Sequence, residues 1–188
     1  MLIFAMICHF LQGLHSSFAE KTSKIIDKFD SFIFAGYPGE FGGQALYDTI
    51  YGIRNDFGKL SITFPKSFSQ FPFVYNYPRG SNYVDIDNES LFPFGYGLSY
   101  SKFEYKNFNV KEASIDEITN GKDILISVDI KNISSVIGKC IPQLYIRKFG
   151  GALLTPLIEL KGFEKIELKP NEEKTIEFKL NYDELKSY

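Results

Sequence analysis

Apolar and polar residues alternate with a period of two through much of the second half of the chain. The clearest runs are residues 124–131 (ILISVDIK), 143–147 (QLYIR) and 176–181 (IEFKLN). Segments with one apolar face and one mostly polar face are typical of antiparallel sandwich strands. Pairs of turn-forming residues separate the runs: Asn120-Gly121, Gly150-Gly151 and Pro170-Asn171. The pattern therefore predicts an all-β sandwich in this part of the chain.

The pattern before residue 90 is different and indicates an α/β unit. Residues 20–30 are polar with apolar positions at helical spacing, which predicts a short amphipathic helix. A buried strand (31–35, SFIFA), a glycine-rich turn (36–43, GYPGEFGG) and a helix (44–51) are predicted to follow. A strand, a loop and a helix in this order are typical of a mainly parallel sheet.

Local signals support that helix and the elements after it. Tyr47 and Tyr51 form an i,i+4 pair, and Gly52 can end the helix in a left-handed conformation. Residues 55–58 (NDFG) are a turn signal, and residues 59–65 (KLSITFP) predict a short strand ended by proline. The polar residues that follow, 79–90, predict an exposed loop.

The first 19 residues permit two interpretations. Residues 2–11 are apolar except for His9, and Ser17-Phe18-Ala19 offers a small-residue cleavage site, as in a signal peptide. No basic residue precedes the apolar run, and the run is too short for a transmembrane helix. The alternative is a buried parallel strand over residues 2–10. A signal peptide would make the protein secreted or periplasmic, whereas a strand would leave it cytoplasmic.

Residues 91–100 (LFPFGYGLSY) hold four aromatic residues, two glycines and a proline. Proline fixes one φ angle, and glycines allow backbone conformations that are closed to other residues. The aromatic rings supply a large apolar surface. Such a run suits neither a helix nor a long strand, so we expect a rigid connection between two packed bodies.

This stretch closely resembles the junction of glycoside hydrolase family 3, which contains β-glucosidases and β-xylosidases. In that family PFGYGLSY joins an α/β sandwich domain to a fibronectin type III-like domain. Residues 35–60 and 160–170 (LKGFEKIELKP) are also similar to family segments, in the family's order. The resemblance implies a partial α/β sandwich domain (1–90), an interdomain junction (91–100) and an antiparallel fibronectin type III-like β-sandwich (101–188).

The resemblance also implies glycoside hydrolysis and indicates which parts of a family member carry the catalytic carboxyl groups. The family consists of retaining glycosidases, which need two carboxyl groups about 5–5.5 Å apart. The nucleophilic aspartate belongs to an N-terminal barrel domain, and the acid/base glutamate to an earlier loop, both upstream of Met1. No residue here matches either motif, so no catalytic residue is assigned. The expectation is a fragment of a β-glycosidase, acting on a β-linked oligosaccharide or glucoside together with the barrel domain, and inactive alone.

Two alternatives to a glycosidase fragment stay open at this point. The aromatic residues over 68–83 could stack on sugar rings, which would make the chain a carbohydrate-contacting or structural module without catalysis. The same rings could instead serve interdomain packing. An inert remnant is the second alternative.

The glycine-rich turn is another candidate binding site in the sequence. It lacks the Lys-Ser/Thr of a phosphate-binding loop and the spacing of a dinucleotide fingerprint. A loop at the carboxyl end of a parallel strand faces the usual ligand crevice of an α/β sheet. Tyr37 and Glu40 are therefore candidates for lining a sugar site. Alternatively, Glu40 lies in the first helical turn and interacts with the positive end of the helix dipole.

Composition excludes several other functions. The 188 residues carry a net charge of -2, which gives no electrostatic case for binding nucleic acid or an anionic membrane. The two cysteines, Cys8 and Cys140, and the two histidines form no metal-ligand pattern, and no cofactor is predicted. Two glycosylation sequons, at Asn88 and Asn132, are expected to arise by chance.

The C-terminal sandwich is expected to be incomplete. About six strands are predicted after residue 100, whereas such a sandwich has ~7. By resemblance, family members continue with one more strand. An unfilled sheet edge would favour aggregation or strand swapping.

Overall fold

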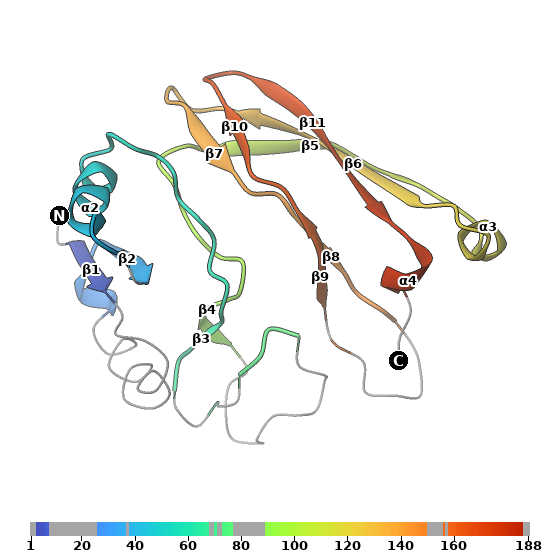
Figure 1. The fold of residues 1–188 in the computed structure, drawn as a ribbon, viewed down its shortest axis with the longest axis horizontal. Helices are drawn as coiled ribbons and strands as arrows, with labels where there is room; N and C mark the ends of the chain where they lie inside the picture. Colours follow the sequence, from blue (N-terminus) through green and yellow to red (C-terminus); the bar gives the residue numbers. More distant parts are fainter. Residues whose placement is uncertain are drawn as a thin grey trace. The chain divides into compact units, whose positions relative to one another are not determined.

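A computed structural model gives the fold of residues 3–7, 26–36, 38–67, 70, 73–76, 89–149, 156 and 158–185 (Figure 1). The chain divides into two compact units. The first, here called the α/β unit, comprises Met1–Arg54 and Lys59–Gly97. The second, here called the β unit, comprises Asn55–Gly58 and Leu98–Tyr188.

The α/β unit contains a parallel strand pair. β1 (Ile3–Ile7) pairs in parallel with β2 (Ser31–Gly36), from Ile3 opposite Ser31 onward (Figure 1). The strand interpretation of the first residues is thus confirmed for residues 3–7. The rest of the proposed signal peptide, residues 8–19, lies outside the described residues. The predicted strand over 31–35 is confirmed, although residues 32–35 are half-buried rather than fully buried and Ser31 is exposed.

The helix predicted over 44–51 is present as α2 (Gly42–Ile50). The Tyr47 and Tyr51 rings lie 4.5 Å apart between centroids, so the i,i+4 pair forms. Gly52 follows with φ +70°, the left-handed conformation expected at a helix end. Of the amphipathic helix predicted over 20–30, the described part contains only a short 3₁₀ helix, η1 (Ile26–Lys28).

An aromatic cluster packs around Phe64 in the α/β unit. β3 (Phe64–Pro65) pairs antiparallel with β4 (Ser90–Phe92), and Phe64 is 3% exposed. The Phe92 ring stands 6.3 Å from Phe64 and 5.4 Å from Tyr96, and Phe34 meets Phe64 edge-on at 5.3 Å. Phe92 and Tyr96, two of the junction aromatics, therefore pack within the α/β unit itself.

The strand predicted over 59–65 is shorter than expected. Leu60 lies outside the strand but makes two backbone hydrogen bonds with the junction. Its N–H donates to Tyr96 O at 2.8 Å, and its O accepts from the Gly95 N–H at 2.7 Å. Gly95 has φ +79°, which explains the glycine there.

The β unit is built from a three-stranded antiparallel sheet and a bent two-stranded ribbon (Figure 1). The sheet has the order β11–β6–β5, and the strands predicted by alternation over 124–131 and 176–181 are β6 and β11. In the ribbon, β7 pairs with β10 and β8 with β9. The strand bounds are β5 (Phe103–Lys111), β6 (Ile124–Asn132), β7 (Gly138–Cys140), β8 (Gln143–Ile146), β9 (Glu159–Phe163), β10 (Ile166–Leu168) and β11 (Glu173–Leu180).

Seven strands are thus described after residue 100, where about six were predicted, and each side of the ribbon is divided into two of them. Ile141 and Pro142 separate β7 from β8, and a proline cannot donate to the ladder. Two short helices complete the unit, α3 (Ile115–Thr119) and α4 (Tyr182–Leu185).

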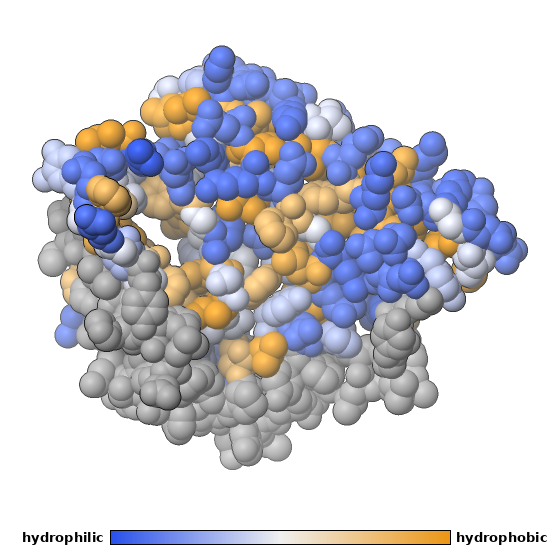
Figure 2. All heavy atoms as spheres, in the orientation of Figure 1, coloured by the Kyte–Doolittle hydropathy of each residue, from blue (hydrophilic) through white to orange (hydrophobic). Residues whose placement is uncertain are grey.

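The core of the β unit lies where apolar residues of the sheet and the ribbon meet. Its fully or nearly buried members are Ile130, Cys140, Ile166, Leu168 and Ile176. They come from alternate positions of their strands, as the period-two pattern predicts. On the face shown in Figure 2, hydrophilic residues cover most of the described surface, with hydrophobic residues in smaller groups. Among the described residues, no helix is long and apolar enough to span a membrane.

Candidate functional site

The glycine-rich turn connects β2 to α2 through two left-handed glycines. Gly36 has φ +59° and Gly39 has φ +67°, and the Gly42 N–H donates to Gly39 O at 3.2 Å. A Cβ on Gly42 would lie 2.6 Å from Cβ of Pro38. Position 42 therefore requires glycine because a side chain would collide with Pro38. Positions 36 and 39 favour glycine because their φ angles are positive.

Glu40 lies in this turn and is exposed. It precedes Phe41, which is the residue at the helix N-cap, and the first turn of α2 contains no acidic residue. The alternative that Glu40 belongs to the first helical turn is therefore wrong. The other candidate, Tyr37, lies outside the described residues. A sugar site made by these two residues stays a prediction.

Asp48 is another carboxylate of the α/β unit, and it has a structural role. It accepts a hydrogen bond from Gln44 Nε2 at 2.7 Å and lies 3.6 Å from Arg54 Nε. The Arg54 N–H also donates to Asp48 O at 3.1 Å. These contacts fix the chain where it leaves α2.

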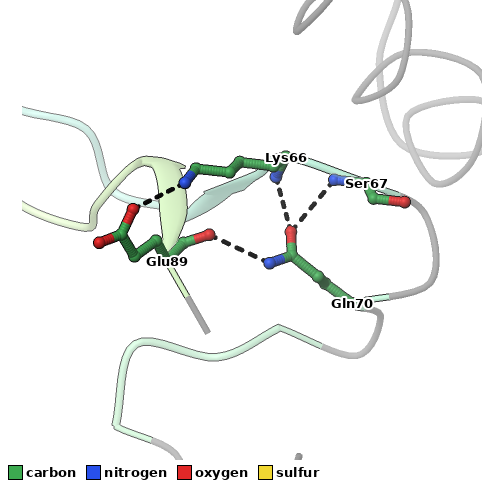
Figure 3. Close-up of polar contacts among 4 residues, drawn as sticks. All are labelled: Lys66, Ser67, Gln70 and Glu89. Carbon is green, nitrogen blue, oxygen red and sulfur yellow. Dashed lines mark hydrogen bonds and ion pairs between the residues drawn. The ribbon is translucent and has the colours of Figure 1, made fainter. Parts of the chain in front are cut away.

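Four residues form a polar cluster beside the β3–β4 pair, which we call the β3–β4 buckle (Figure 3). The Gln70 side-chain oxygen accepts from the Lys66 N–H at 2.6 Å and the Ser67 N–H at 3.1 Å. Its amide nitrogen donates to Glu89 O at 3.0 Å, and Lys66 Nζ pairs with the Glu89 carboxylate at 2.7 Å. These hydrogen bonds join the residues after β3 to the start of β4, which points to a structural role. The sequence pattern gave no signal for it, because Gln70 stands in a stretch dominated by aromatic residues.

The aromatic residues proposed for sugar stacking lie mostly outside the described residues, including Tyr77. Tyr75 is described, and its ring stacks on Phe94 with centroids 4.3 Å apart and 17° between the planes. This contact is packing within the α/β unit.

The Asn132 sequon is part of the core of the β unit. Asn132 is 0% exposed, and its amide nitrogen donates to Val136 O and Leu168 O, both at 2.9 Å. Its side-chain oxygen accepts from the Ser134 N–H at 3.0 Å. A glycan cannot be accommodated there in the folded chain. The Asn88 sequon lies outside the described residues.

The described residues contain no group of three or more His, Cys, Asp or Glu side chains that could hold a metal ion. Cys140 is a buried thiol, with Sγ 3.1 Å from the Tyr105 hydroxyl. Burial, and to a lesser extent the hydrogen bond with Cys140, raises the pKa of Tyr105. Cys8 lies outside the described residues.

Comparison with known families gives two matches. Residues 14–100 match the glycosyl hydrolase family 3 C-terminal domain, and residues 141–188 match a fibronectin type III-like domain. Together the two matches cover more than half of the chain, in the order found in the structure.

Individual relatives agree with this result. The chain is 39% identical over 170 residues to thermostable beta-glucosidase B of Acetivibrio thermocellus, covering 83% of this chain and 22% of that protein. It is 36% identical over 168 residues to a beta-xylosidase of Formosa agariphila, covering 86% of this chain and 23% of that protein. The chain thus spans about a fifth of the length of these relatives.

A solved structure extends the similarity to the fold. The beta-glucosidase of Listeria innocua in complex with glucose matches with a TM-score of 0.78 at 35% identity, over 87% of this chain and 24% of that one. A variant of the same enzyme has been solved in complex with laminaribiose and matches with a TM-score of 0.75. The chain therefore belongs to glycosyl hydrolase family 3, of which it carries the C-terminal region, including a fibronectin type III-like domain.

Proposed function

We propose that this chain completes a family 3 β-glycosidase, which hydrolyses O-glycosidic bonds of β-linked glucosides or oligosaccharides. The observation that carries the proposal is the match to the family's C-terminal domain followed by the β unit. Relatives named beta-glucosidase and beta-xylosidase favour a β-linked substrate. The binding of laminaribiose by the Listeria innocua enzyme favours a β-linked glucose disaccharide among such substrates.

In this proposal the catalytic carboxylates lie outside residues 1–188. A retaining glycosidase needs two carboxyl groups about 5–5.5 Å apart. Asp48 is held by Gln44 and Arg54, and Glu89 by Lys66, so these two carboxylates serve local structure. Turnover then depends on the barrel domain that the family resemblance implies.

The contribution of this chain to the substrate site is assigned to Tyr37 and Glu40. The support is the position of Glu40, exposed in a loop that follows the carboxyl end of β2. Carboxylates are good acceptors for sugar hydroxyls, and charge-assisted hydrogen bonds are stronger than neutral ones. Glu40 is a binding residue in this proposal and has no catalytic role.

The absence of catalysis in the isolated chain is tested with a nitrophenyl β-glucoside. The purified, folded chain is expected to show no turnover above buffer. Turnover that disappears in Glu40→Gln would overturn the proposal. Glu177→Gln is the matched control, because Glu177 is an exposed carboxylate on β11 of the β unit.

The role of Glu40 is tested after the chain is combined with the N-terminal part of thermostable beta-glucosidase B. In this assembly Glu40→Gln is expected to raise KM about tenfold, the effect of losing about 1.4 kcal/mol of substrate binding. Glu177→Gln should leave KM unchanged. Equal kinetics for both variants would remove Glu40 from the site.

A further inference from the structure

The segment Asn55–Gly58 follows α2 in the sequence but belongs to the β unit. Both the nitrogen and the oxygen of the Asn55 side-chain amide form hydrogen bonds. Asn55 Nδ2 donates to Ser101 Oγ at 2.7 Å and to Ile137 O at 3.0 Å. Asn55 Oδ1 accepts from the Tyr100 N–H at 3.1 Å. One side chain therefore joins the start of the β unit to the turn before β7.

The next two residues add contacts of different kinds. Asp56 Oδ1 lies 2.5 Å from Lys139 Nζ, and this hydrogen bond raises the pKa of Lys139. The Phe57 ring meets the Tyr100 ring edge-on, with centroids 5.2 Å apart. Three consecutive side chains thus bind the rest of the β unit. We call residues 55–58 the strap.

The β unit is shaped to receive the strap. A Cβ on Gly138 would lie 2.1 Å from Ser101 Oγ and 3.0 Å from Asn55 Nδ2. Gly138 is buried and Ser101 is 6% exposed, so neither group can move aside without loss of packing. A glycine is therefore required where Asn55 docks.

The strap lies between two stretches of chain that belong to the α/β unit. The chain leaves the α/β unit after Arg54, returns at Lys59 and leaves again after Gly97. Arg54 is bound to Asp48 near the end of α2 and is covalently joined to Asn55. The end of α2 is thereby anchored twice in succession, once by Arg54 and once by the strap.

We propose that the strap makes the stability of α2 conditional on the folded β unit. With the strap bound, the chain that leaves α2 is held first by Arg54 and then by residues 55–58. Without these contacts, residues 55–58 become a free loop between Arg54 and Lys59. α2 has only nine residues, which is short for a helix to persist by itself. The strap is a conformational device, and this inference does not depend on the proposed glycosidase function.

Hydrogen–deuterium exchange of the full chain tests the proposal. Asn55→Ala should speed exchange of the α2 amides 46–50 about tenfold, since local opening controls exchange. The matched control is Ser114→Ala, which removes the N-cap of α3 in the β unit and should leave α2 at the wild-type rate. Wild-type exchange in α2 of Asn55→Ala, with the Tyr100 amide deprotected, would overturn the proposal.

Two milder variants keep the test decisive if Asn55→Ala does not fold. Ser101→Ala removes one acceptor of Asn55, and Asn55→Asp keeps the acceptor for the Tyr100 N–H while losing the donor. Both should speed α2 exchange by less than Asn55→Ala, about threefold, because each loses part of the Asn55 hydrogen bonding. Faster exchange confined to the β unit in both variants would contradict the coupling.

Discussion

At the scale of single residues, asparagine side chains organise the turns of the β unit. Asn132 closes the turn after β6 and reaches across to Leu168 at the end of β10. Its amide is completely buried, and without it the Leu168 carbonyl loses this donor, whereas the Val136 carbonyl still accepts from the Ser101 and Ser134 hydroxyls. A buried polar group that loses its hydrogen bond costs about 1–3 kcal/mol.

Replacing Asn132 should therefore be among the more damaging polar substitutions in the chain. Asn132→Ala is expected to lower the free energy of unfolding by about 3 kcal/mol, because the buried Leu168 carbonyl loses its donor. Urea denaturation monitored by circular dichroism measures this change. Ser134→Ala, which removes only a partner of Asn132, should cost about 1 kcal/mol. A midpoint for Asn132→Ala equal to that of the wild type would refute the role.

At the scale of elements, α3 and α2 show two ways in which local sequence sets a helix end. α3 begins with a capping box, in which the Ser114 hydroxyl accepts from the Glu117 N–H and the Glu117 carboxylate accepts from the Ser114 N–H. Lys122 also bonds that carboxylate. By contrast, α2 begins after a glycine turn and has no side-chain cap.

The capping box predicts a pH dependence of α3. The hydrogen bonds from Lys122 and the Ser114 backbone lower the pKa of Glu117 to about 2, from an ordinary 4.5. A lowered carboxyl pKa adds stability that is present above the unfolded pKa and is lost as pH falls through the folded value. Protection of the α3 amides should therefore decline between about pH 4.5 and pH 2.

Nuclear magnetic resonance measures this decline through the amides of residues 118–121, which donate to carbonyls at the start of α3 and within it. Glu117→Gln should flatten the dependence over the same range. A profile for the wild type that is already flat between those two pH values would contradict the assigned role of Glu117.

Two adjacent glycines of α2 should respond oppositely to the same substitution. A Cβ at Gly42 would collide with Pro38, whereas nothing lies within 4 Å of a Cβ at Gly43. Gly42→Ala is expected to destabilise the chain by about 1–3 kcal/mol through overpacking. Gly43→Ala should stabilise it by up to about 1 kcal/mol through helix propensity. Thermal unfolding of both variants provides the measurement, and equal shifts would show that the turn is not shaped as described.

The elements that sequence predicts well here are those with local causes. Alternation identified β6 and β11, and the i,i+4 pair of Tyr47 and Tyr51 identified α2. The strap was predicted only as a turn, because its partners are distant in sequence. Asn55 bonds Ser101 and Ile137, which are 46 and 82 positions away, and no local pattern carries such information.

The candidate site was predictable to a smaller extent. The glycine turn and its place after β2 follow from local residue types, and the structure agrees with both. The helical position of Glu40 was wrong, because α2 begins at Gly42 and leaves Glu40 in the preceding turn. The β3–β4 buckle escaped prediction since Gln70 and Glu89 meet only when β3 and β4 pair.

At the scale of the whole molecule, the chain belongs to glycosyl hydrolase family 3 and spans about a fifth of its relatives. The α/β unit contains an aromatic cluster around Phe64, and the β unit has a largely aliphatic core. Asp48 and Glu89, two of its described carboxylates, are engaged in local structure. These features agree with the proposed role of the chain in completing a β-glycosidase.

The central claim is tested most directly by reconstitution. The N-terminal part of thermostable beta-glucosidase B, without the region that matches this chain, is mixed with the purified chain and a nitrophenyl β-glucoside. Neither part alone should turn over the substrate, and the mixture should. The relative's own C-terminal region serves as the positive control. Recovery with that region but not with this chain would contradict the claim, as would turnover by this chain alone.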